Sequence, residues 1–180
     1  MYLVKRLGVD SRDVVLSGDS AGGNLALALL RYLQDHADEG KLPLPGGVLL
    51  WSPWVDLTVP PLEIAGHRNA RYDVVLPQSA LWGYRVFIPE DRGAEDAYIS
   101  PVKKAIPTRV PIWLNWGGRE VFADQIKEFV ETQRKHAGSR VGTYEVADAP
   151  HDLFGVGEPL GWVKETKEAF GHAVRFLNES

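Results

Sequence analysis

Short apolar runs alternate with amphipathic stretches along the chain and predict a mixed α/β fold. Continuous apolar runs are typical of strands buried on both faces of a parallel sheet. Stretches in which apolar residues recur every three or four positions predict helices. The predicted strands are residues 14–17, 48–51, 112–116 and 141–146. The predicted helices are residues 2–7, 22–36, 77–87, 124–136 and 158–177.

Because these strands and helices alternate, we expect a mostly parallel sheet with helices on both faces, in one domain over residues 1–180. Residues 52–110 interrupt the alternation, since they carry Pro53, Pro60 and Pro61 early and read as irregular apart from one helix. We interpret this segment as an insertion that roofs an active site, although a packed surface helix is equally consistent.

The spacing of apolar residues also predicts which helix faces are buried. Two helices carry the clearest pattern. In the helix 22–36 the residues at helical spacing are Leu25, Leu29, Leu30 and Leu33. In the helix 158–177 the residues expected to face inward are Val163, Phe170, Val174 and Leu177.

Residues 13–24, DVVLSGDSAGGN, read as a strand, a turn of small residues and the start of a helix. Ser20 stands between Gly18 and Gly22, the G-x-S-x-G arrangement of a nucleophile elbow. We expect these glycines to avoid collisions with the neighbouring strand and helix. The turn raises a serine hydroxyl at a helix N-terminus, where the N–H of Ala21 favours an oxyanion. The alternative is a tight glycine turn in which Ser20 only caps the helix.

A serine nucleophile needs a base, and the base needs a carboxylate. In open parallel sheets such groups follow the carboxyl ends of strands. Glu120 and Asp124 follow the strand 112–116, and His151 follows the strand 141–146, which gives the order serine, acid, histidine.

For each of these residues a structural role is also available. His151 is open to the reading of a loop histidine that hydrogen-bonds locally. Glu120 suits the first turn of a helix, and Asp124 suits a helix N-cap. We favour Glu120 as the acid, because a triad acid normally occupies the first loop positions after its strand.

Composition narrows the possible functions. The net charge of −4 argues against a nucleic-acid surface, and the absence of cysteine excludes disulfides and thiolate metal sites. No phosphate loop or histidine pair at ligand spacing is present, so we expect neither a metal nor another cofactor. No apolar run approaches the roughly 20 residues of a membrane span. Residues 1–7 are too short and too charged for a secretory signal, and we expect a cytoplasmic location.

Four stretches together resemble the hormone-sensitive-lipase-like family of α/β-hydrolases. These are GDSAGG at 18–23, YISP at 98–101, the acid turn 117–124 and PHD at 150–152. The similarity runs from about residue 2 to the C-terminus, and GDSAGG is its most specific part. The resemblance implies that Ser20 is the nucleophile, His151 the base and Glu120 the acid. The family more often carries aspartate at the Glu120 position, and Asp124 matches a second acidic position.

The family's HGGG motif, which supplies oxyanion-hole N–H groups upstream of the serine, does not occur in this chain. The resemblance therefore implies the C-terminal portion of an α/β-hydrolase fold, truncated at the N-terminal side. One edge of the strand 14–17 would have no partner from this chain. Because open apolar edges tend to pair, we expect strand pairing or a homo-oligomer through that edge.

The function expected on these grounds is a serine carboxylic ester hydrolase that works through an acyl-enzyme. A small or medium apolar ester is the expected substrate, with Trp54 as a possible wall of its pocket. Two alternatives stay open. One is a non-catalytic module that binds a small molecule or a partner, and the other is an acyltransferase.

Overall fold

A computed structural model describes residues 2–36 and 42–179 and contains one parallel sheet of four strands. The strands are β1 (Val15–Asp19), β2 (Gly47–Trp51), β3 (Ile112–Gly117) and β4 (Val141–Val146). They lie in the order β1-β2-β3-β4, and every neighbouring pair is parallel. The predicted parallel α/β architecture is therefore confirmed.

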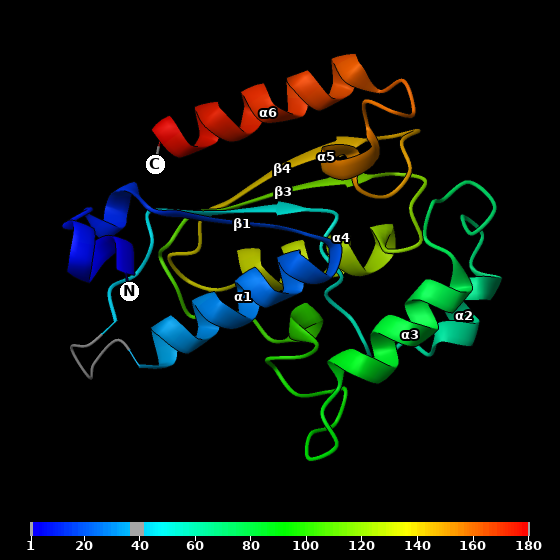
Figure 1. Cartoon of the computed structure of the whole chain (residues 1–180), viewed down its shortest axis with the longest axis horizontal. Helices are drawn as coiled ribbons and strands as arrows, with labels where there is room; N and C mark the ends of the chain where they lie inside the picture. The colour runs from blue at the N-terminus through cyan, green and yellow to red at the C-terminus, as the bar shows by residue number, and fades with distance from the viewer. Residues whose placement is uncertain (1, 37–41, 180) are drawn as a thin grey trace.

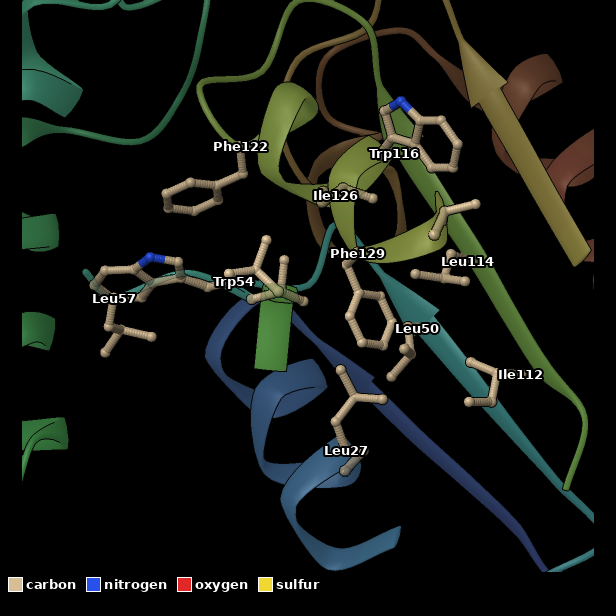
Figure 2. Packing of buried hydrophobic residues seen from close by; sticks show 14 of the residues in the cluster. Leu27, Leu50, Trp54, Leu57, Ile112, Leu114, Trp116, Phe122, Ile126 and Phe129 are labelled. Carbon is tan, nitrogen blue, oxygen red and sulfur yellow. The ribbon is translucent and has the colours of Figure 1, made fainter. Parts of the chain in front are cut away.

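Helices cover both faces of this sheet (Figure 1). Helices α1 (Ser20–Asp35) and α4 (Ala123–Arg134) pack on one face, and α6 (Val163–Asn178) packs on the other. On the first face Phe129 of α4 points toward Leu50 of β2 and Leu27 of α1 (Figure 2). All three side chains are fully buried. The burial of Leu50 is expected, because β2 is covered by helices on both faces.

Most predicted elements appear within three residues of the expected bounds. Helix α3 spans Pro77–Phe87 and β4 spans residues 141–146, as predicted. The first helix is a π-helix, η1 (Tyr2–Arg6), and Gly8 after it adopts a positive φ of 70°. Within residues 2–36 and 42–179, four short helices were not predicted from the pattern. They are η2 (Ser11–Asp13), α2 (Pro61–Gly66), η4 (Pro101–Lys103) and α5 (Leu153–Val156).

The prediction for the last helix is wrong in its start and in part of its buried face. Residues 158–162 form turns, and α6 begins at Val163. Its fully buried residues are Ala169 and Ala173, whereas Val163 and Val174 are 40% and 56% exposed. Phe170 is 42% exposed, but its ring packs on Trp51 with centroids 4.6 Å apart. Small residues face the sheet because Trp51 and Trp113 already fill the space beneath the helix. Leu177 does point inward, where it lies over Gly47 of β2.

Helix α1 also differs from its predicted pattern. Leu30 is buried, but Leu25 is 64% exposed and Leu29 is 43% exposed. The explanation is the position of β1, which forms an edge of the sheet and leaves the outer face of α1 uncovered by the described residues. A groove of about 290 Å³ lies there, lined in part by Leu29 and Tyr32.

The segment 52–110 lies against the end of the sheet at which the strands end. Helices α2 and α3 are found beside this end, to which the strand arrows point (Figure 1). Two backbone hydrogen bonds attach the segment to the strand ends, from Trp54 N–H to the carbonyl of Ser20 and from Ser52 N–H to the carbonyl of Asn115. The chain after β2 therefore returns over the loops that follow the strands.

The turn between β1 and α1 depends on two glycines, of which only one was predicted. A Cβ on Gly18 would lie 2.2 Å from the carbonyl oxygen of Gly22, so only glycine fits. A Cβ on Gly22 would meet nothing closer than 3.8 Å, which contradicts the expected collision at that position. The close approach occurs at Gly23 instead, whose Cβ would lie 2.8 Å from Cβ of Pro53.

These contacts predict opposite outcomes for two neighbouring alanine substitutions. Gly18→Ala should lower the free energy of unfolding by about 1–3 kcal/mol or more, because the new methyl meets backbone atoms that have no room to move. Gly22→Ala should be neutral or stabilise the helix by up to about 1 kcal/mol, because alanine favours helices over glycine. Urea unfolding midpoints of the two variants measure the difference. Equal losses in both variants would contradict this account of the turn.

Candidate active site

A cavity of about 360 Å³ lies at the end of the sheet where the strands end. The structure brings four of the residues singled out in the sequence to its walls. These are Ser20, Ala21, Trp54 and His151. Glu120 lies directly behind His151 and has no exposed surface. Loops after β1, β2, β3 and β4 therefore contribute to one site, as expected for the carboxyl ends of parallel strands.

Ser20 is the first residue of α1 and has a positive φ of 49°, a strained conformation for a residue with a side chain. Its carbonyl accepts the N–H of Trp54 at 2.9 Å, which anchors the turn from the opposite side. Asp19 is the N-cap residue, and no side chain caps the helix. The backbone N–H groups of the first turn, including that of Ala21, have no partner within the helix. The turn thus places a hydroxyl and free N–H donors at the same cavity.

Glu120 and His151 face each other in a buried environment. Oε1 of Glu120 lies 3.6 Å from Nδ1 of His151, and neither atom has a hydrogen-bond partner among the described residues. The other oxygen, Oε2, accepts the hydroxyl of Ser52 at 2.6 Å and the N–H of Gly117 at 2.9 Å. One carboxylate oxygen is therefore fixed by the protein, and the other is directed at the imidazole.

Burial and charge shift the pKa values of this pair. Burial raises the pKa of the Glu120 carboxyl above its ordinary value, and His151, Ser52 and Gly117 oppose part of that rise. Burial alone would lower the pKa of His151. The carboxylate of Glu120 and the charges of Asp73 and Asp152 outweigh this effect, so the pKa of His151 is raised. The surroundings thus stabilise an imidazolium at this position.

Asp124, the other candidate acid, is engaged elsewhere. Its side chain is 55% exposed, and its two oxygens accept both terminal nitrogens of Arg68 at 2.7 Å each. His67 lies 3.5 Å from the same carboxylate. The guanidinium of Arg68 lowers the pKa of Asp124. The structure therefore brings Glu120, and not Asp124, to His151.

Two further residues that the sequence analysis missed contact this pair. Ser52 is buried, has a φ of 45°, and accepts the N–H of Asp152 at 2.9 Å while its hydroxyl bonds Glu120. The sequence did offer a signal for Ser52, because it directly follows the strand 48–51 and functional groups often follow the carboxyl ends of parallel strands. Asp73 accepts the backbone N–H of His151 at 2.9 Å. No local pattern marks Asp73, because it lies in the irregular segment.

Aromatic rings form one wall of the cavity. Trp54 stacks on Phe122 with ring centroids 5.4 Å apart, and both are labelled together in Figure 2. The rings of Phe122 and His151 are nearly perpendicular, with centroids 5.2 Å apart. Val74 and Val75 from the segment 52–110 line the cavity as well. The site is thus mainly apolar, with its polar groups gathered at Ser20 and His151.

The side chains of Ser20 and His151 both reach the cavity, but no hydrogen bond joins them in the described part of the chain. Such bonds are often long before a substrate binds. Among residues 2–36 and 42–179 no group of three or more His, Asp or Glu side chains is arranged to hold a metal ion. The described helices include none with the length and apolar content to cross a membrane.

Comparisons with known proteins agree with this geometry. A family model for the α/β-hydrolase fold matches residues 2–155. An esterase of Acinetobacter venetianus is 31% identical over 125 residues, which cover 69% of this chain and 39% of the relative. A putative acetyl-hydrolase, LipR, of Mycobacterium tuberculosis is 34% identical over 67% of this chain and 38% of its own length.

Solved structures show the same fold. The crystal structure of an esterase from the bacterial hormone-sensitive lipase family superposes with a TM-score of 0.76 at 22% identity. The superposition covers 98% of this chain and 56% of the esterase chain. A crystal structure of EstE5 gives a TM-score of 0.75 at 24% identity, with the same coverage.

The chain thus spans less than two fifths of the two curated relatives and somewhat more than half of the two solved structures. This chain itself contains the four-stranded parallel sheet, the turn at Ser20 and the facing pair of Glu120 and His151. By the family model and by its fold, this chain belongs to the α/β-hydrolase family, and it is similar to esterases of whose length it covers part.

Proposed function

We propose that this site is the catalytic centre of a serine carboxylic ester hydrolase. The observation that carries the proposal is the buried pair of Glu120 Oε1 and His151 Nδ1, which have no hydrogen-bond partner elsewhere in the described part of the chain, beside a cavity that Ser20 and His151 both line. A carboxylate that holds one ring nitrogen leaves the other nitrogen free to serve as a base. Ser20, His151 and Glu120 are the proposed nucleophile, base and acid.

In the proposed reaction, the hydroxyl oxygen of Ser20 attacks the ester carbonyl while Nε2 of His151 takes its proton. The N–H of Ala21 donates to the oxyanion, and the carboxylate of Glu120 stabilises the imidazolium. The tetrahedral intermediate formed by this attack then expels the alcohol, which receives the proton from His151. Water, deprotonated by His151, attacks the acyl-serine, releases the acid and returns the proton to Ser20. In the hormone-sensitive-lipase-like family that the chain resembles, further oxyanion donors come from an upstream HGGG motif, which is absent from these 180 residues.

The walls of the cavity support an apolar ester of small or medium size. Trp54, Phe122, Val74 and Val75 present hydrocarbon surface, and the described residues that line the cavity include no lysine or arginine. An acyl group with its own negative charge would therefore find no counter-charge there and would lie near Asp152. The names of two relatives, an esterase and an acetyl-hydrolase, agree with a short acyl group.

The nucleophile is tested by intact-mass spectrometry after exposure to a fluorophosphonate. The chain should gain one adduct, and Ser20→Ala should gain none, because only an activated serine reacts at an appreciable rate. Ser17→Ala is the matched control, because Ser17 is a nearby serine that lies on β1, and this variant should keep the adduct. An adduct that persists in Ser20→Ala would contradict the proposed nucleophile. Absence of any adduct would favour a binding module on the same scaffold.

The acid is tested by comparing Glu120→Gln with Asp124→Asn. Glu120→Gln should lower the rate of acylation by up to about 10⁴-fold, because an amide neither fixes the imidazole tautomer nor stabilises its charge. Asp124→Asn breaks an exposed ion pair with Arg68 and should change the rate by only a few-fold. The reverse order of effects would assign the acid to Asp124.

We also propose that a second copy of the chain covers the open edge of β1 when the 180 residues are expressed alone. An unpaired strand edge beside exposed Leu25, Leu29 and Tyr32 favours association. Sedimentation velocity should show a concentration-dependent dimer, and Leu29→Glu should shift it to the monomer. A parent chain that stays monomeric at about 100 μM, where weak dimers with a micromolar Kd form, would contradict this proposal.

A further inference from the structure

The acid and the base of the proposed site lie on loops that follow different strands, so their alignment depends on contacts between those loops. The short stretch 69–73, which lies in the segment after β2, contacts both of them. We propose that Asp73 is a positioning residue that holds His151 in register with Glu120 and ties both to the wall of the cavity. This inference rests on the proposed function.

The carboxylate of Asp73 bridges the two loops through their backbones. Oδ2 accepts the N–H of Val121, the residue after Glu120, at 2.7 Å. Oδ1 accepts the N–H of His151 itself at 2.9 Å. Hydrogen bonds to an ionised acceptor are stronger than those between neutral groups. A single carboxylate therefore fixes the backbone positions of the acid and the base relative to each other.

Asn69 fixes the same stretch to the acid loop with the opposite polarity. Its side chain is buried, and Nδ2 donates to the carbonyls of Glu120 at 3.0 Å and of Gly118 at 3.3 Å. The acid loop thus donates an N–H to Asp73 and offers carbonyls to Asn69. This second attachment keeps Asp73 in place, so the link between the loops of Glu120 and His151 depends on two side chains, Asn69 and Asp73.

Asp73 also sets part of the cavity wall. Its Oδ1 accepts the N–H of Val74 at 2.7 Å, and Val74 and Val75 line the cavity that contains Ser20. Because one residue fixes the wall and the backbone of His151 together, an acyl group held by the valines would be placed relative to the base. Misplacement by about 1 Å at such a site costs about 100-fold in rate.

The charge of Asp73 acts on His151 in addition to its geometry. The charged groups that face His151 are Glu120, Asp73 and Asp152, whereas Phe122 contributes only a neutral ring. All three carboxylates raise the pKa of His151, and they stabilise the imidazolium that forms when Ser20 loses its proton. Removal of one of them should therefore lower the pKa of the base.

The test uses two substitutions that separate charge from geometry. Asp73→Asn keeps the shape, but it removes the charge and turns an NH₂ group either toward the N–H of Val121 or toward those of His151 and Val74. Asp73→Glu keeps the charge and displaces the carboxylate by one methylene. Asp96→Asn is the matched control, because Asp96 also accepts a backbone N–H, that of Tyr98, but contacts neither loop.

The rate of fluorophosphonate acylation as a function of pH is the first measurement. Asp73→Asn should react about 100-fold more slowly. The midpoint of its acidic limb should move to lower pH, since a base with a lower pKa stays neutral at lower pH. Asp73→Glu should also react slowly but keep the parental midpoint. Asp96→Asn should match the parent in both. A parental rate in Asp73→Asn or in Asp73→Glu overturns the proposal.

Two measurements do not depend on activity. In the parent, the amides of Val121 and His151 should be protected from hydrogen exchange by their bonds to Asp73. NMR titration should report the pKa of the His151 ring. Asp73→Asn should speed exchange of both amides together and lower that pKa, with unfolding free energy measured in parallel. A parent that fails to react with the probe refutes the proposed function alone. Unchanged amides with an unchanged imidazole pKa overturn the role of Asp73, and Asp73→Glu supplies the amide test if Asp73→Asn does not fold.

Discussion

A carboxylate and an imidazole that are both removed from water face each other where β3 and β4 end. Burial of an ionisable pair is costly unless the remaining hydrogen-bonding atoms are satisfied. Ser52 and the N–H of Gly117 satisfy one oxygen of Glu120. The other oxygen is left with His151 as its nearest partner. Much of the local structure is explained by this requirement, because the segments that follow β2, β3 and β4 each supply a member of the pair or hold one in place.

The loops that carry the pair pack backbone against backbone. A Cβ on Gly117 would lie 2.2 Å from the carbonyl oxygen of Pro150, and a Cβ on Gly118 would lie 2.3 Å from that of Ala147. Only glycine permits this approach, which brings the acid loop within reach of His151. The same device joins β1 to α1 at Gly18. Glycines thus create the close approach of neighbouring loops, and charged or polar side chains such as Asp73 fix its register.

The sequence predicted the parts of this arrangement that are encoded locally. Strand positions followed from continuous apolar runs, and the elbow at Ser20 followed from a six-residue motif in a strand-turn-helix context. The burial of Ala169 and Ala173 in α6 was not predictable from the helix's own pattern. It depends on Trp51 and Trp113, which lie more than 50 residues earlier in the chain and take up the space that large helix residues would need. Asp73 was missed for a related reason, since its partners at Val121 and His151 are distant in sequence and are backbone groups that carry no signature.

Backbone strain gives an independent indication of where the chemistry lies. Among the described residues, the non-glycine residues with positive φ are Ser20, Ser52 and Asp152, and all three lie in or directly against the cavity. Each such conformation costs of order 1–3 kcal/mol and persists only where the surroundings determine it. Ser20 is held by the N–H of Trp54, while Ser52 and Asp152 are held by their mutual hydrogen bond. A fold selected for stability alone would place glycine at these turns. Serine and aspartate at strained positions around one cavity are instead expected where side-chain chemistry offsets the cost.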